Sequence, residues 1–124
     1  MARIIRIIMD RVEVMAELED TRTAQAIWDA LPIRAEVGTW GKEIYFPVPV
    51  SLDLEGGQET VSVGDMGYWP SGHAFCIFFG LTPASRRDEI RPASAVNVFG
   101  RVVSDIKLLE GVSEGTTVVV EKGE

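Results

Sequence analysis

The chain has 124 residues, of which 46% are apolar, and its 12 basic and 19 acidic residues give a formal net charge of −7. This length and composition predict one folded domain, residues 1–124, whose core needs no disulfide or metal. An acidic surface repels phosphate backbones and anionic lipid, so neither nucleic acid nor a membrane is expected as a partner.

The start of the chain and its cysteine content indicate a compartment. Arg3 and Arg6 interrupt the apolar start, so the run of apolar residues that an export signal needs is missing. Cys76 is the single cysteine, so no internal disulfide can form and a reducing environment is expected. Together these features predict a cytoplasmic protein.

The chain opens with a predicted hairpin and one clear helix. Residues 3–9 and 11–17 are rich in Ile and Val, and a tight connection at residues 10 and 11 would join them as antiparallel strands. The helix is expected over residues 21–31, where apolar residues recur at helical spacing and Pro32 follows. Trp28 falls on the apolar face of this helix, which predicts that it anchors the core.

Beyond the helix, short strands with turn residues between them are typical of a barrel or a sandwich. The strands are expected at residues 33–37, 43–50, 60–63, 66–69, 74–79, 94–103 and 116–121, with a turn at 56–57 and a short helix at 105–110.

The strand at residues 74–79 favours the barrel. In "HAFCIFF" both alternating faces are apolar, with Phe75 and Ile77 on one face and Cys76 and Phe78 on the other. A strand that is apolar on both faces must be covered on both sides. We therefore expect a closed barrel with the helix that carries Trp28 packed on the outside.

Three long motifs resemble a known family. The runs "TWGKEIYFPVPV", "VGDMGYWPSGHAFCIFFGLTP" and "IRPASAVNVFGRV" are similar to the small bacterial and archaeal cyclophilin-like proteins, and the resemblance covers essentially the whole chain. It implies a mainly β fold, a closed cyclophilin-like antiparallel barrel of roughly eight strands, with one main helix and one short helix. The fold carries over more safely than the function, because sites are grafted onto folds.

The catalytic motifs of true cyclophilins are missing from the matching segment. Those isomerases use an arginine in a Phe-His-Arg strand motif, aided by a Gln-Gly-Gly-Asp run, to donate a hydrogen bond to the imide nitrogen as the peptide bond twists. Here the comparable strand reads "KEIYFPVPV" and contains neither. We therefore do not expect an efficient prolyl isomerase, and we expect Arg34, Arg91 or Arg101 to supply such a donor only if the fold brings one of them to a cleft.

The sequence also lacks suitable residues for an acid–base pair and for a metal site. His73 and Cys76 are three residues apart on a strand, so their side chains face opposite sides and cannot form an acid–base pair. A metal site needs three or four suitable ligands brought together, and one His with one Cys falls short. We expect no metal, no cofactor and no catalytic residue.

The remaining signal is an aromatic rim. The run Trp69-Pro70-Ser71-Gly72 fits a tight turn, which would put Trp69 at a strand end, near the barrel mouth. The candidate ligand-binding residues are Tyr45, Tyr68, Trp69, His73 and Asn97. Taken singly, each also fits a structural role, such as an aromatic ring that closes the barrel or a hydrogen-bonded amide that holds a strand.

Three functions remain open. The leading hypothesis is a domain that binds a small molecule or an extended, proline-containing peptide in an aromatic-rimmed cleft. The first alternative is a prolyl isomerase with rearranged active-site residues. The second is an interaction module whose exposed edge strand pairs with a partner, as in a homodimer.

Overall fold

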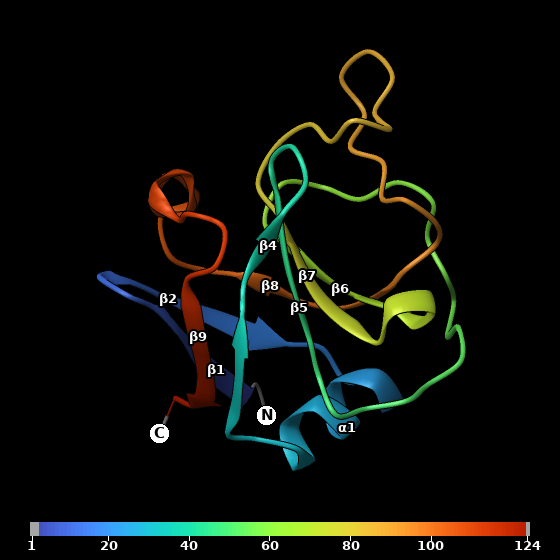
Figure 1. Ribbon diagram of the computed structural model, residues 1–124. Coiled ribbons are helices and arrows are strands. Elements are labelled where there is room, and N and C mark those ends of the chain that lie inside the picture. Colours follow the sequence, from blue (N-terminus) through green and yellow to red (C-terminus); the bar gives the residue numbers. More distant parts are fainter. Residues whose placement is uncertain (1–2, 124) are drawn as a thin grey trace.

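The computed structural model describes residues 3–123 and contains one antiparallel sheet of nine strands (Figure 1). In sheet order the strands are β3, β9, β1, β2, β8, β6, β7, β5 and β4. Their bounds are β1 Arg3–Met9, β2 Val12–Leu18, β3 Ile33–Glu36, β4 Gly38–Thr39, β5 Glu43–Pro47, β6 Asp65–Trp69, β7 Ala74–Phe78, β8 Asn97–Val102 and β9 Thr117–Lys122.

The two edges of this sheet belong to one short segment. β3 and β4 are the outermost strands, and in the chain they are separated by Val37 alone. β3 pairs with β9 while β4 pairs with β5, so the segment 33–39 bends from one edge to the other and nearly closes the barrel. If residues 33–39 are counted as one bent strand, the barrel has eight strands. The predicted antiparallel barrel is confirmed, and it is nearly closed.

The barrel interior is filled by alternate residues of the strands. Phe46 and Phe75 stack with their ring centroids 4.7 Å apart, and Phe99 meets Phe75 edge-on at 5.0 Å. Both arrangements are favourable for aromatic rings. Ile44 and Ile77 lie on the same inner face and are fully buried. The main core therefore lies inside the barrel, where buried residues of β1, β2 and β9 join those of β5, β7 and β8.

The main helix α1 (Arg22–Asp29) lies against one end of the barrel (Figure 1). The Thr21 hydroxyl accepts a hydrogen bond from the backbone N–H of Ala24, so it caps the helix as expected. Ala24 and Ile27 are buried, but Trp28 is only partly buried. Its ring packs on the edge of the core, with the guanidinium of Arg3 at 5.4 Å. Trp28, which the helical spacing predicts to anchor the core, therefore lies at the edge of the core.

The predicted short helix is present as the 3₁₀ helix η2 (Ile106–Gly111). Asp105 caps it by accepting a hydrogen bond from the backbone N–H of Lys107. A second 3₁₀ turn, η1 (Pro70–Gly72), occupies the place of the turn predicted after Trp69.

Two expectations about the loops were wrong. Residues 60–63 form no strand, and the segment 48–64 touches its neighbours through isolated pairings, of which Val61 with Ile90 is one. β5 ends at Pro47 rather than at residue 50, since Pro47 and Pro49 lack the N–H groups that a ladder needs. The outer face of β7 is covered by Ile90 and Val96 of the segment 80–96 and by Val61, and not by α1.

Candidate functional site

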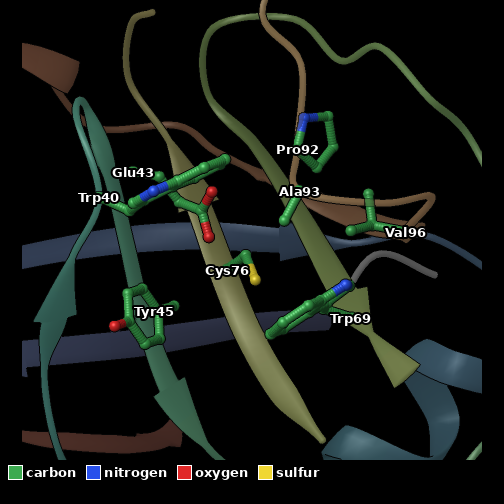
Figure 2. Close-up of a pocket in the computed structure, with 8 residues that line it drawn as sticks. All are labelled: Trp40, Glu43, Tyr45, Trp69, Cys76, Pro92, Ala93 and Val96. Atoms are coloured by element: carbon green, nitrogen blue, oxygen red, sulfur yellow. The ribbon is translucent and has the colours of Figure 1, made fainter. Parts of the chain in front are cut away.

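A cleft of about 280 Å³ opens on the outer face of the barrel, over β5 and β7 (Figure 2). One wall comes from β5 and the turn before it, and the opposite wall from the segment 92–96. The lining residues are Trp40, Glu43, Tyr45, Trp69, Cys76, Pro92, Ala93 and Val96.

Strand alternation explains why these side chains meet. Tyr45 lies opposite Cys76 in the β5–β7 register, and Glu43 lies opposite Phe78. Because neighbouring residues of a strand face opposite sides, Ile44 turns into the barrel while Glu43 and Tyr45 turn out of it. The outer face of β7 forms a second apolar cluster, which consists of Ala74, Cys76, Phe78, Ile90 and Val96. The cleft is the open part of this second cluster.

Trp69 is held in place from two sides. Its indole Nε1 donates a hydrogen bond to the Ser94 hydroxyl at 2.6 Å, which ties β6 to the opposite wall. On the other side its ring lies so close to Gly72 that a Cβ there would come within 2.6 Å of it. The absence of a side chain at position 72 therefore lets the ring lie flat against the turn. The result is a preformed aromatic wall.

Trp40 is fixed by backbone hydrogen bonds. Its N–H donates to the carbonyl of Glu43 at 3.0 Å, and the N–H of Glu43 donates to the carbonyl of Trp40 at 3.2 Å. These bonds make a tight turn between β4 and β5. In Figure 2 the Trp40 ring lies beside the carboxylate of Glu43, and Tyr45 follows farther along the same strand.

Glu43 is the unusual residue of the cleft. Its side chain is 6% exposed, and within residues 3–123 its Oε1 finds no hydrogen-bond partner and its carboxylate forms no salt bridge. Burial raises the pKa of Glu43 from an ordinary 4.5 to about 7, and a hydrogen bond from Cys76 offsets this only in part. Such a carboxyl group can gain or lose its proton near neutral pH.

Cys76 lies on the cleft floor beside Glu43 (Figure 2). It is buried, and burial together with the negative charge of Glu43 raises its pKa well above the ordinary value. The thiolate is the reactive form of cysteine, so this thiol is a poor nucleophile. It forms part of the apolar floor, as the sequence predicted for a small buried residue.

Two of the five predicted site residues line the cleft. Tyr45 is 36% exposed on one wall and Trp69 is half-buried on another. Tyr68 does not line it, because it alternates with Trp69 and points into the barrel, where it is fully buried. Its hydroxyl donates to the carbonyl of Val50 at 2.6 Å and accepts from the N–H of Leu52 at 3.2 Å. Tyr68 thus anchors the loop after β5.

Asn97 is also a structural residue. It is 1% exposed, and its Oδ1 accepts from the N–H of Glu55 at 2.6 Å. Its Nδ2 donates to the Thr23 hydroxyl at 3.1 Å and to the carbonyl of Asp53 at 2.9 Å. The amide is therefore satisfied and ties the 53–55 loop and α1 to β8. It is not the polar anchor of the cleft.

His73 lies outside the cleft. It follows η1 in the left-handed backbone region, with φ 50°, and it is exposed. Its carbonyl accepts a hydrogen bond from the N–H of Val48 at 2.9 Å. That bond extends the β5–β7 pairing past Pro47. His73 is therefore not among the residues that line the cleft.

The sequence reasoning missed Trp40, Glu43 and the wall at 92–96. The signal for Glu43 was available, because a lone acidic residue sits two positions before Tyr45 in the otherwise apolar run "EIYFPV". The wall at 92–96 carries no periodic pattern, since it is a loop placed by tertiary contacts.

Among residues 3–123, no three His, Cys, Asp or Glu side chains come together as ligands for an ion. Nor does that range include a helix both long enough and apolar enough to cross a bilayer.

The closed antiparallel barrel, with its helix at one end and a cleft on its outer face, defines a β-barrel domain of the cyclophilin type. The family model described as Cyclophilin-like matches residues 3–121, and the chain belongs to that family. Its structure is similar to the solution structure of a hypothetical protein from Archaeoglobus fulgidus. That protein is 44% identical, the match covers 98% of this chain and 95% of that one, and the TM-score is 0.85. No curated protein matches the chain.

Proposed function

We propose that this protein is a ligand-binding domain whose outer cleft takes a compact apolar group, either a small molecule or one side chain of an extended peptide. The observation that carries the proposal is the lining, in which three aromatic side chains and an apolar wall surround one buried carboxyl group. Ligand sites are typically apolar hollows with a few convergent polar groups. The volume of about 280 Å³ suits a group no larger than a substituted ring.

Hydrogen bonds fix two walls of the cleft. The hydrogen bond from Trp69 to Ser94 and the paired backbone bonds between Trp40 and Glu43 hold two walls in place. A preformed site loses less side-chain entropy on binding, which supports specific rather than incidental binding.

The prolyl isomerase alternative lacks its donor in this cleft. Within residues 3–123, no arginine is among the lining residues. Arg91 is next to the wall, but its guanidinium is engaged by Glu89 at 2.6 Å and lies 3.7 Å from Glu59. A proline ring would fit between the aromatic side chains, yet no guanidinium of the described residues lines the cleft to donate a hydrogen bond to the twisted imide nitrogen. Binding of such a peptide is compatible with the site, whereas fast isomerisation is not supported.

The partner-strand alternative is supported less well than the cleft. The two outermost strands, β3 and β4, are halves of one bent segment that nearly closes the barrel. Closure removes the long free edge on which strand addition depends.

The test is a titration that follows the indole N–H signals of Trp40 and Trp69 by NMR. The probes are benzyl alcohol, benzylamine and the tetrapeptide Ala-Ala-Pro-Phe amide. At least one probe should shift both signals to saturation. Ala93→Trp should abolish this response, because residue 93 is exposed and a ring there would fill the cleft.

Leu81→Trp is the matched control, since Leu81 is exposed outside the lining of the cleft and a ring there should leave the response unchanged. Saturable shifts that persist in Ala93→Trp, or no response to any of the three probes, would overturn the proposal.

A further inference from the structure

We infer that the cleft selects ligands that carry a cationic nitrogen on a compact apolar body, and that the carboxylate of Glu43 is the counter-ion on the cleft floor. This inference rests on the proposed function and names the ligand class of the same site.

The first argument is that no cation of the described chain pairs with Glu43. The side chain is 6% exposed and its Oε1 makes no hydrogen bond within residues 3–123. A buried carboxylate without a partner is costly, and an ion pair with a hydrogen-bonded cation removes that cost. A ligand ammonium group at Oε1 would be such a partner.

Neighbouring cations of the chain are engaged elsewhere. Lys42, next to Glu43 on the chain, directs its Nζ toward Glu110 of η2 at 3.8 Å. Arg91 lies beyond the opposite wall and is held by Glu89. Neither of them is among the residues that line the cleft. The place of a cation next to Glu43 is therefore open to a ligand.

The other groups that face Glu43 do not compete for this role. Besides Glu43, the titratable side chains lining the cleft are Tyr45 on β5 and Cys76 on β7. Burial holds the thiol of Cys76 in its neutral form, because its pKa is raised. The opposite wall, Pro92, Ala93 and Val96, carries no charge. Among the described residues that line the cleft, Glu43 is therefore the only one that carries a charge.

The second argument is the aromatic lining. Trp40, Tyr45 and Trp69 surround the floor (Figure 2). The face of an aromatic ring attracts a cation within about 6 Å, most strongly for tryptophan. These rings therefore add to the attraction of the carboxylate for an ammonium group and also contact its apolar body. An anionic ligand would meet the opposite conditions, namely a carboxylate and a protein of net charge −7.

The experiment compares three probes that share a benzyl or phenyl ring and differ in the polar group, namely benzylammonium, benzyl alcohol and benzoate. Dissociation constants are measured at pH 8 by the indole NMR titration. Benzylammonium should bind at least about tenfold more tightly than benzyl alcohol, and benzoate more weakly than both.

Glu43→Gln should lower the affinity for benzylammonium to that for benzyl alcohol, because the amide keeps the shape of the side chain and removes its charge. Glu36→Gln is the matched control: it makes the same change at an exposed position of β3 and should preserve the preference.

The wild-type protein gives a second readout that needs no variant. With the pKa of Glu43 at about 7, ionisation increases the affinity for benzylammonium by about tenfold between pH 6 and pH 8. Binding at pH 6 should release a proton, which calorimetry in buffers of different ionisation enthalpy detects. The affinity for benzyl alcohol should not rise over this range.

Equal affinities for benzylammonium and benzyl alcohol from pH 6 to pH 8, with both blocked by Ala93→Trp, would overturn this inference and leave the proposed function standing. If none of the three ring probes and no proline peptide binds in the cleft, the proposed function itself fails and this inference fails with it.

Discussion

Buried polar groups differ between the inner and the outer face of the barrel wall. On the inner side of the barrel, the hydroxyl of Tyr68 makes two hydrogen bonds and the amide of Asn97 makes three. On the outer side, Glu43 is also buried but has an oxygen without a partner. The polar groups of the interior hold loops in place, while the polar group of the outer face is left available.

This difference separates structural from functional candidates among residues of similar burial. Buried polar atoms are normally satisfied, so an unsatisfied one needs an explanation. Arg6 shows the alternative case: its Nε has no hydrogen bond, but its guanidinium lies 3.4 Å from Glu13 and 3.0 Å from Glu121. Glu43 has no such ion pair among the described residues, and it lines a cleft.

The largest effect is expected on the inner face. Phe75→Ala should lower the free energy of unfolding by about 3–5 kcal/mol, because it opens a cavity between Phe46 and Phe99. Urea denaturation measures the loss. A change of less than about 1 kcal/mol would show that the stacked rings are not the centre of the core.

On the outer face, Glu43→Gln should stabilise the protein at high pH. The pKa of Glu43 is about 7 in the folded chain against an ordinary 4.5. Ionisation of Glu43 is therefore less favourable in the folded than in the unfolded chain. The free energy of unfolding is unaffected by this below about pH 4.5, and it falls by up to about 3 kcal/mol as the pH rises through 7.

The variant removes this loss, so its advantage should be absent at pH 4 and grow to its full size by pH 8. Unfolding curves of both proteins at the two pH values test this. An equal difference at pH 4 and pH 8 would mean that Glu43 does not titrate in this range.

A smaller effect on stability is expected for the cleft wall. Trp69→Ala should cost about 1–2 kcal/mol, because the ring is only half-buried, yet it should abolish probe binding in the indole and amide NMR titration. If Trp69→Ala proved as destabilising as Phe75→Ala, Trp69 would belong to the core and the comparison of the two faces would fail.

The barrel could be predicted from the sequence because its signals are local. The two apolar faces of "HAFCIFF" and the helical spacing up to Leu31 depend on residues close together in the chain, and both features appear in the structure. Trp28 shows the limit of such a pattern: spacing identifies the inward face of a helix but not how close to the edge of the core it packs.

The candidate site could be predicted only in part. Alternation places Tyr68 and Trp69 on opposite faces of a strand but does not tell which of them faces outward, since this depends on the register of β6 against β7 and β8. The direction of Asn97 and the cover over Cys76 depend on the loops 48–64 and 80–96, whose positions are set by contacts between distant segments. No local pattern encodes those contacts.

The most direct test of the central claim is the titration of the Glu43 side-chain carboxyl, followed by its ¹³C chemical shift with and without benzylammonium. The free protein should show a pKa of about 7, and the bound ammonium should lower it because the cation favours the carboxylate. The central claim is that Glu43 is a buried carboxyl group without an ion-pair partner among the described residues and that it binds a cationic ligand. A pKa near 4.5 in the free protein, or a pKa that benzylammonium leaves unchanged at saturation, would contradict this claim.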